Sequence, residues 1–365
     1  MKATVWARSY THSRARVSVT APHAPGLAGR EVLEGVQVER FRYLPERGEV
    51  VGYSPLGIPH LLRTSPVAVL ALPAFVIGMG RAARGATQHS SILHAHWGPV
   101  GAIAALAVDR RTPIVLSLHG TDVALAERGG LWRAALRFAC RRAALVLPVS
   151  VSMAEVVHRL VPDLPLGRAL VVGNGIDPSL LECNIPEDDR SDIAFVGRLT
   201  EAKGAFDAVR ALALVTGGVR LTLAGPGDPA PVTELAASLG VSARVRTLGA
   251  LSHVDALGLI AHARVLVLPS RAEGFSVVSL EAAALGTPVV ASDVGAIAEV
   301  LGGNDSLHAP GDVPALARLL ERAITDRVWA GGLAERARSS AERYTWPEIA
   351  RTVTSAYESI ARVVR

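Results

Sequence analysis

The chain has 365 residues, of which 50% are hydrophobic and 4% aromatic, and it carries a formal net charge of +5. This length exceeds one ordinary hydrophobic core and suits two α/β domains, and the composition excludes long disordered regions. The longest apolar run, residues 67–80, is too short to span a bilayer, and residues 1–16 lack the apolar centre of a signal peptide, so we expect an intracellular protein.

The first half of the chain alternates between strand-like and helix-like segments. Short apolar runs that end in Pro, His, Ser or Gly, or lead into a turn, predict strands at residues 16–22, 36–44, 92–98, 112–120, 143–150 and 169–177. A helix is predicted between two of these strands, at residues 101–110. This spacing is typical of a parallel, doubly wound sheet.

A polar linker, residues 181–192, precedes a second half with the same pattern. Strands are predicted at residues 192–199, 219–227, 244–250, 263–270 and 287–292. Helices are predicted at residues 206–216, 233–240, 279–286 and 312–326, the last with Asp312 as its N-cap. The two halves therefore predict two Rossmann-like domains, in which ligands bind beyond the carboxyl ends of the strands.

Two basic residues follow the first strand of the second half. Arg198 and Lys203 lie five residues apart in GRLTEAKG, and Lys203 is one of only two lysines in an arginine-rich chain, the other being Lys2. A guanidinium and an ammonium group at this spacing can meet one phosphate group. A surface loop with two solvated cations is the alternative.

Two glutamates lie eight residues apart in EGFSVVSLE, where a predicted strand leads into a helix. Glu273 lies in the loop, and Gly274, Phe275 and Ser276 begin the helix. Amide groups at a helix start lack intrahelical partners and favour an anion or a sugar hydroxyl. Glu281, two turns later, can accept both hydroxyls of a ribose, and an ion pair with a nearby Arg is the alternative.

Histidines follow two strands of the first half. His119 stands with Asp122 in SLHGTD, and His94 and His96 alternate in HAHWG. No third metal ligand is evident beside the last two, so we predict no metal site. The chain has no GxGxxG at the start of either half and no GxxxxGK[ST], so a nicotinamide enzyme and a P-loop NTPase lack their most specific sign.

Taken together, these motifs resemble the retaining glycosyltransferases of family 4, which have the GT-B fold. The similar segments are GRLTEAKG at 197–204, AGPG at 224–227, LPS at 268–270, EGF with the second glutamate at 273–281, NGID at 174–177, SLHG at 117–120 and YTWPEIA at 344–350. The resemblance covers the chain from about residue 16 to its end. It implies an α/β fold of two Rossmann-like domains whose parallel sheets face a cleft. Residues 1–180 would bind the acceptor, joined by a helix at 341–365, and residues 181–340 would bind the nucleotide sugar.

The resemblance also implies an activity, the metal-independent transfer of a hexose with retention. The donor would be a nucleotide-diphosphate sugar, which is a substrate, so no cofactor and no metal is expected. The acceptor would be lipid-linked or a saccharide, as in the synthesis of a glycolipid or polysaccharide, and no nucleic acid is expected as a partner. The implied catalytic residues are His119 and Glu273, and the implied donor-binding residues are Arg198, Lys203, Gly274, Phe275, Ser276 and Glu281. The residues from Leu248 to Leu251 lie where the base packs in the family.

The start of the chain departs from the family pattern. A family member begins with a strand, a Gly-Gly loop and a helix before a strand like residues 16–22, whereas about fifteen residues without a glycine precede that strand here. We therefore expect the first strand and its Gly-rich loop to be missing, through a misassigned or truncated start. A truncated, non-catalytic GT-B-like nucleotide-sugar-binding protein is one alternative function, and a GT-B epimerase is another.

The charge distribution indicates an anionic partner for the first half. Residues 1–180 hold 20 Lys and Arg against 11 Asp and Glu. A helix-like stretch, residues 128–142, combines five arginines with apolar residues, a pattern suited to an anionic membrane face. Packing of that helix on its own sheet is the alternative. We expect a cytoplasmic protein that is peripheral on the inner face of the cytoplasmic membrane.

Overall fold

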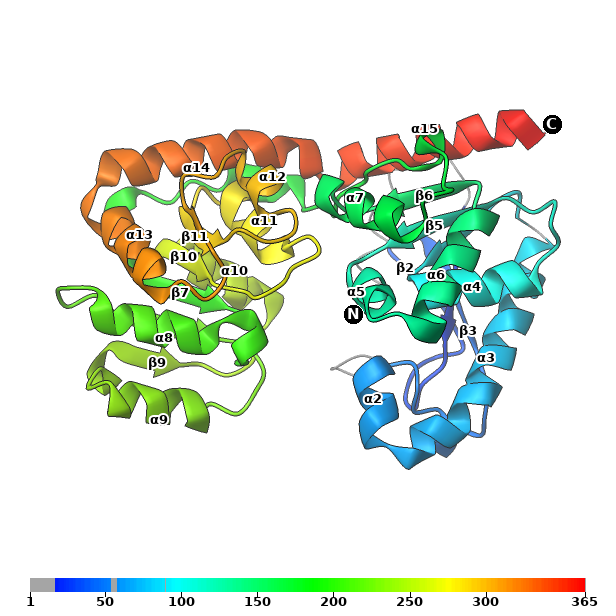
Figure 1. The fold of residues 1–365 in the computed structure, drawn as a ribbon, viewed down its shortest axis with the longest axis horizontal. Helices are drawn as coiled ribbons and strands as arrows, with labels where there is room; N and C mark the ends of the chain where they lie inside the picture. Colours follow the sequence, from blue (N-terminus) through cyan, green and yellow to red (C-terminus); the bar gives the residue numbers. More distant parts are fainter. Residues whose placement is uncertain (1–16, 54–57, 89, 365) are drawn as a thin grey trace. The chain divides into compact units, whose positions relative to one another are not determined.

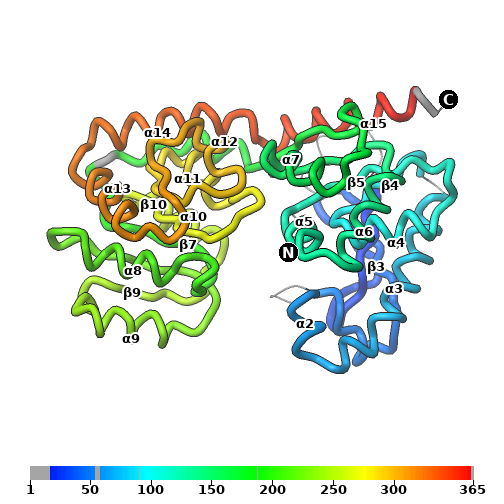
Figure 2. The backbone as a smooth tube through the Cα atoms, viewed as in Figure 1, coloured from blue at the N-terminus to red at the C-terminus, as the bar shows by residue number. Residues whose placement is uncertain are grey.

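The computed structural model describes residues 17–53, 58–88 and 90–364, which form two compact units. Unit 1 comprises the described residues up to Val149, residues 154–172 and those from Ile349 onward. Unit 2 comprises residues 150–153 and 173–348. Figure 2 follows this path, from unit 1 in blue and cyan to unit 2 in green to orange and back to unit 1 at the end of the chain. The predicted change of domain at residue 180 and return at residue 341 differ from these bounds.

Unit 1 contains two three-stranded sheets (Figure 1). One has the order β1-β3-β2, with β1 (Ser18–Pro22), β2 (Arg30–Leu33) and β3 (Val36–Phe41). The other has the order β4-β5-β6 and is parallel throughout, with β4 (Leu93–His96), β5 (Ile114–Leu118) and β6 (Leu145–Pro148). The predicted absence of the family's first strand and loop concerns residues 1–16, which lie outside the described residues.

One strand of unit 1, β2, was not predicted, and it runs antiparallel to β3. Leu33 pairs with Val36 across a two-residue turn, in which Glu34 has a φ of 47° and Gly35 a φ of 83°. Positive φ at both central residues is what a tight hairpin turn requires. The Glu-Gly pair between REVL and VQVERF was therefore the sequence signal for this hairpin.

The helices of unit 1 cover its sheets. They are α2 (Ile58–Thr64), α3 (Pro66–Thr87), α4 (Gly98–Ala107), α5 (Thr121–Glu127), α6 (Gly130–Arg142) and the unit 1 parts of α7 (Val151–Leu160) and α15 (Trp346–Val364). The apolar run at 67–80 lies inside α3, which has 22 residues. Within the described part of the chain, α3 alone is long and apolar enough to cross a membrane by length and composition.

Residues 169–177 do not form the predicted strand. Ala169 makes one isolated bridge to Val146, and the chain then passes into unit 2. There, Gly173 and Gly175 lie against aromatic rings, and a Cβ atom on Gly175 would approach the Trp346 ring to 2.5 Å. In this segment the backbone therefore packs closely against aromatic side chains. The alternation of residues that predicts a strand does not reveal such a contact.

Unit 2 contains a six-stranded parallel sheet of order β12-β11-β10-β7-β8-β9. The strands are β7 (Ser191–Val196), β8 (Leu221–Ala224), β9 (Val245–Thr247), β10 (Ala263–Leu268), β11 (Val289–Ser292) and β12 (Leu307–His308). The helices are α8 (Ala205–Leu214), α9 (Ala230–Ser238), α10 (His253–Ala261), α11 (Val277–Ala284), α12 (Ile297–Leu301), α13 (Val313–Thr325) and α14 (Arg327–Ala341). The strands and helices predicted for this half are confirmed, as is Asp312, whose side chain accepts from Ala315 N at 2.9 Å.

The core of unit 2 is built from small aliphatic residues, as the low aromatic content requires. Apolar side chains of α8 and α13 pack with those of the central strands in one buried cluster that includes Leu212, Val265, Val290 and Leu320. Valine-rich strands buried on both faces are typical of a parallel sheet covered by helices. This packing fixes the carboxyl edge of the sheet, from which the site loops emerge.

Candidate functional site

The carboxyl edge of the unit 2 sheet brings Lys203 and Glu273 into contact. Lys203 ends a short 3-10 turn after β7, and Glu273 lies in the loop between β10 and α11. Because β7 and β10 are neighbours, their loops meet. Lys203 Nζ donates to Glu273 Oε1 at 2.6 Å, and the two side chains are 27% and 14% exposed. The sequence predicted both residues as ligand groups but not their contact.

The same carboxylate oxygen takes a second hydrogen bond. The buried hydroxyl of Ser270 donates to Glu273 Oε1 at 2.8 Å. Among the described residues no partner is recorded for Glu273 Oε2, and the ammonium group of Lys203 has two further protons to donate. The pair therefore keeps both acceptor and donor capacity for a ligand.

Two glycines hold these loops by close backbone contact. Gly204 has a φ of 76°, and a Cβ atom on it would lie 2.0 Å from the carbonyl oxygen of Pro269. Gly295 has a φ of 59°, and a Cβ atom on it would lie 2.2 Å from the carbonyl oxygen of Glu273. Only glycine fits such positions without strain. The contact of Gly204 sets the distance between the loop of Lys203 and the loop of Glu273, and the contact of Gly295 packs the loop after β11 against Glu273.

A buried carboxylate also links the two loops, and sequence reasoning missed it. Asp207, in the first turn of α8, is bound by Arg210 and by Arg271, each at 2.8 Å. The amide of Arg271 also donates to Ala202 O at 2.9 Å. The available signal was an acidic residue on the apolar face of the predicted helix at 206–216. Asp207 therefore positions the β10–α11 loop that carries Glu273.

Within the described ranges, neither Arg198 nor Glu281 forms a hydrogen bond or ion pair with Lys203 or Glu273. The side chain of Arg198 is exposed and has no recorded hydrogen bond or ion pair within the described ranges. Glu281 is buried in α11, and its Oε1 lies 2.7 Å from Nε2 of His253, whose side chain is 58% exposed. The partner of Glu281 is therefore His253 and not the arginine of the predicted alternative. Sequence reasoning missed this histidine.

α11 begins at Val277, three residues after Gly274, where the motif placed the start of the helix, and two residues before the predicted helix at 279–286. Ser276 is the N-cap, and its Oγ accepts from Ser279 N at 3.3 Å. Phe275 is buried and packs edge-to-face on Tyr344, with ring centroids 5.3 Å apart. The side chain of Phe275 thus belongs to the core of unit 2, and only its backbone and that of Gly274 remain for a ligand.

In unit 1, His94, His96 and His119 form a row of stacked rings. The centroids of His94 and His96 are 4.4 Å apart, and those of His96 and His119 are 5.3 Å apart. His96 Nδ1 lies 3.1 Å from His119 Nε2. Burial lowers the pKa of His94 to about 3 and the pKa of His96 well below 6.5. Both rings are therefore neutral at pH 7, and His119 has a neutral imidazole as its hydrogen-bond partner.

The sequence showed no third candidate ligand beside His94 and His96, but the structure places His119 next to His96. Two of the ring nitrogens, His96 Nδ1 and His119 Nε2, already face each other at 3.1 Å. In the described ranges no group of three or more His, Cys, Asp or Glu side chains is arranged to hold a metal ion.

Asp122 organises the loops around this row. Its buried carboxylate accepts from Gly98 N at 3.1 Å, from His119 N at 3.2 Å and from Gly120 N at 2.9 Å. The first of these amides follows β4 and the other two follow β5. Asp122 therefore joins the carboxyl-edge loops of two neighbouring strands and fixes the backbone of His119.

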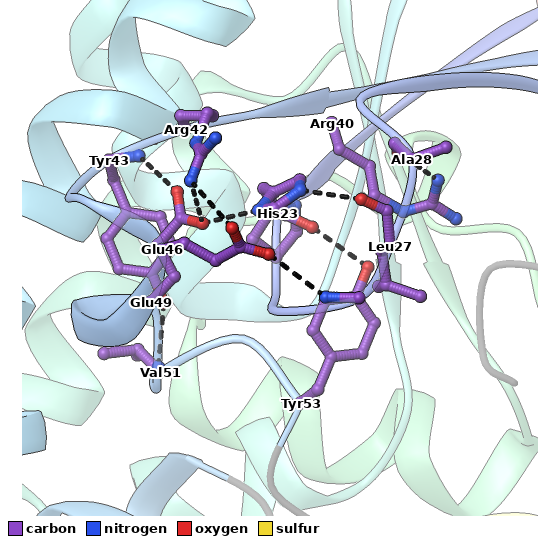
Figure 3. A network of polar contacts seen from close by, with 12 residues as sticks. His23, Leu27, Ala28, Arg40, Arg42, Tyr43, Glu46, Glu49, Val51 and Tyr53 are labelled. Carbon is purple, nitrogen blue, oxygen red and sulfur yellow. Dashed lines mark hydrogen bonds and ion pairs between the residues drawn. The ribbon is translucent and has the colours of Figure 1, made fainter.

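A buried acid–base pair holds the loop after β1 (Figure 3). His23 Nδ1 lies 2.5 Å from Glu49 Oε2, and its Nε2 donates to Leu27 O at 2.8 Å. The carboxylate of Glu49 also accepts from Tyr43 N at 3.2 Å and from Arg42. Sequence reasoning missed this network, which secures the β1–β2 connection to the segment after β3.

The arginines of α6 are used within unit 1. Arg133 donates to Ala126 O and Glu127 O, and Arg137 donates to Leu160 O. Arg141 pairs with Asp163, and Arg142 donates to the carbonyl oxygens of Asp109 and Thr112. These contacts favour the alternative for this helix, packing within its own domain.

The neutral histidines predict a dependence of stability on pH. Because the folded pKa of His94 is about 3 against 6.5 for an ordinary histidine, the unfolded chain binds more protons between these values. The free energy of unfolding therefore falls as the pH decreases from 6.5 toward 3. The substitution His94→Gln should lower the slope of the unfolding free energy against pH in this range by about 1.4 kcal/mol per pH unit. Urea unfolding at several pH values measures it, and an unchanged slope would contradict the assignment.

Two family models match the chain. The model described as Glycosyltransferase Family 4 matches residues 6–180, and the model described as Glycosyl transferases group 1 matches residues 190–326. An uncharacterized glycosyltransferase of Methanocaldococcus jannaschii is 28% identical over 93% of this chain and 93% of its own length. Glycogen synthase of Mycobacterium tuberculosis is 31% identical over 74% of this chain and 69% of its own length.

Solved structures establish the fold. Sucrose-phosphate synthase from Thermosynechococcus elongatus is similar with a TM-score of 0.79 at 21% identity, covering 98% of this chain and 92% of its own. Anabaena HepE in complex with UDP-glucose gives a TM-score of 0.68 at 23% identity, covering 89% of this chain and 87% of its own. Trehalose-6-phosphate synthase OtsA gives 0.73 at 14% identity, covering 98% and 94%. The predicted GT-B architecture of two Rossmann-like domains is confirmed.

Proposed function

We propose a specific reaction for this chain, which belongs to glycosyltransferase family 4: it moves a hexose from a nucleotide-diphosphate sugar to a lipid-linked or saccharide acceptor, with retention and without a metal. Relatives and neighbours in the fold include glycogen synthase and HepE, the second solved with UDP-glucose. Those names support a nucleotide sugar as the donor. The contact between Lys203 and Glu273 is the observation that carries the proposal.

That contact brings together a cation and a carboxylate that can accept hydrogen bonds from sugar hydroxyls. A nucleotide sugar has its phosphate and its sugar hydroxyls on either side of a single C1–O bond. The two remaining protons of the Lys203 ammonium suit a phosphate oxygen, and Glu273 Oε2 suits a sugar hydroxyl. The 2.6 Å contact would hold the ammonium group and the carboxylate on either side of the C1–O bond that breaks. Arg198, exposed and five residues before Lys203, supplies a second cation for the diphosphate.

The proposed chemistry needs no carboxylate as acid or nucleophile. The bond from C1 to the diphosphate oxygen breaks with its electrons going to the leaving group. The acceptor hydroxyl forms the new C1–O bond on the same face and passes its proton to the leaving phosphate. Positive charge placed where negative charge develops lowers the barrier to this step. Arg198 and Lys203 would supply that charge, and His119 of unit 1 would contact the sugar near C1.

The remaining site residues have proposed roles in donor binding. Glu281 would accept the ribose hydroxyls, and the amides of Gly274, Phe275 and Ser276 would support sugar or phosphate. The acceptor is proposed to belong to the synthesis of a glycolipid or cell-envelope polysaccharide. We propose a cytoplasmic location, peripheral on the inner face of the membrane. This location suits a soluble donor and a lipid-linked acceptor.

A donor screen tests the binding half of this proposal. Thermal unfolding would be followed with UDP, GDP and ADP sugars for the wild type and for Glu281→Gln. One nucleotide is expected to raise the transition temperature of the wild type. The variant loses a charge-assisted hydrogen bond of about 1.5–3 kcal/mol, so its dissociation constant should rise about tenfold or more. His253→Ala is the control, because its exposed ring is the present partner of Glu281 and should be dispensable to the ligand.

This screen, combined with assays of sugar transfer and of donor epimerisation, separates the alternatives. No shift with any nucleotide sugar would contradict the donor site. Binding without transfer to any acceptor would favour the truncated, non-catalytic GT-B-like nucleotide-sugar-binding protein. Conversion of the donor sugar to its epimer without an acceptor would favour the epimerase.

A further inference from the structure

α3 carries apolar side chains on two faces. The inner face is buried in unit 1 and consists of Ala68, Ala71, Phe75 and Ala83. The outer face exposes Val67, Val69, Leu70, Val76 and Ile77. A surface helix of a globular unit ordinarily turns polar residues outward, and single exposed apolar residues are common. Five on one helix form a patch, and a patch of this kind marks an interaction site.

The exposed residues follow the helix as a stripe. Val67, Leu70 and Ile77 are spaced three and seven residues apart, with exposed Pro73 between them, so they share one side of the helix. From Val67 to Ile77 the stripe is about 15 Å long at 1.5 Å per residue. The side chain of Leu70 is 82% exposed. Figure 1 shows α3 at the periphery of unit 1.

The segment around this stripe carries no negative charge. No Asp or Glu occurs between Glu49 and Asp109, a stretch that includes all of α2 and α3. Arg63 near the end of α2 and Arg81, four residues after Ile77, are both exposed. Basic residues therefore flank the apolar stripe on both sides along the chain.

We propose that this face of α3, with Arg63 and Arg81, binds the surface of a bilayer rich in anionic phospholipid. The apolar side chains enter the boundary between headgroups and acyl chains, and the guanidinium groups meet lipid phosphates. A second copy of the chain is disfavoured because a symmetric contact repeats the same surface, which would bring arginines toward arginines. The inference rests on the proposed function in one respect, the lipid-linked acceptor that such a bilayer would carry.

This proposal places the membrane surface on α3 and not on α6, the helix that the sequence analysis offered as a candidate. The arginines of α6 are bound to carbonyl oxygens and to Asp163, so their charge is already engaged. No such contact of the Arg63 or Arg81 side chain is recorded among the described residues. The apolar stripe and the available cations therefore coincide on α2 and α3.

Flotation of the full chain with vesicles tests the proposal. The wild type should float with vesicles of equal parts phosphatidylcholine and phosphatidylglycerol at low salt, and not with phosphatidylcholine alone. The double variant Leu70→Ser with Ile77→Ser should lower the bound fraction at least about tenfold. The double variant Arg63→Ser with Arg81→Ser should lower it by about tenfold and weaken its salt dependence.

The matched control is Leu131→Ser on α6, because Leu131 is 83% exposed and lies outside the stripe. It should float like the wild type. A wild type that stays in the soluble fraction overturns the proposal, as does an equal loss in the control. Dissociation of a dimer by the α3 variants, seen by sedimentation, would assign the stripe to a second copy instead. Lys203→Ala should float like the wild type. Flotation therefore tests the membrane-binding surface independently of the proposed transfer reaction.

Discussion

Lys203→Ala should lower kcat/KM for sugar transfer by about 10²–10³-fold. The ammonium group is the partner of Glu273 and the proposed cation for the leaving diphosphate. Because that negative charge develops in the transition state, most of the loss should appear in kcat, with a smaller change in KM. Steady-state rates of donor consumption with the acceptor, or of donor hydrolysis, measure the effect.

The fold should survive this substitution. The ion pair is part-exposed, and such pairs contribute about 0.2–1 kcal/mol to stability. Ser270 still donates to Glu273 in the variant. Arg318→Ala is the matched control, because it removes an exposed cation from α13 without touching the site loops. Equal kcat/KM for Lys203→Ala and this control, with unchanged thermal unfolding, would sink the proposed role.

Gly204→Ala should destabilise unit 2 by about 3 kcal/mol or more and abolish donor binding. A positive φ costs an alanine about 1 kcal/mol, and its Cβ atom would lie 2.0 Å from the carbonyl oxygen of Pro269. Relief of that overlap requires the β7–α8 and β10–α11 loops to separate. The separation would break the contact between Lys203 and Glu273. Calorimetric unfolding and nucleotide binding measure the two effects.

The comparison that isolates the steric effect is Gly217→Ala. Gly217 has a φ of 84°, close to that of Gly204, but nothing lies within 4 Å of a Cβ atom built on it. This variant should lose about 1 kcal/mol from the backbone alone and should bind donor normally. If both variants lose the same stability, the close approach of the two loops contributes nothing of its own.

The sequence predicted unit 2 well because its strands and helices have clear periodicity and end at glycines. Lys203, Glu273 and Glu281 could be singled out because charged residues in apolar, glycine-rich segments are conspicuous. Their partners could not be predicted. His253 meets Glu281 through the packing of α10 on α11, and Asp207 meets Arg271 through the pairing of β7 with β10. Such contacts depend on sheet order, which local pattern does not encode.

Unit 1 was harder for physical reasons of the same kind. The β2–β3 hairpin rests on a two-residue turn, and the predicted strand at 169–177 is diverted by the approach of Gly175 to an aromatic ring. The apolar run in α3 gave no sign of which side would face outward. His96 was discounted as strand alternation, yet the parallel pairing of β4 and β5 places it beside His119.

Because lysine is scarce in this chain, the amine of Lys203 can be labelled selectively. Apart from Lys2 and the terminal amine, Lys203 carries the only primary amine of the chain. An amine-selective reagent therefore modifies one position of the second half, and mass spectrometry of a single peptide reports its extent. A diphosphate bound at this amine would shield it. Occupancy of the site thus becomes measurable by covalent footprinting, with no acceptor and no turnover required.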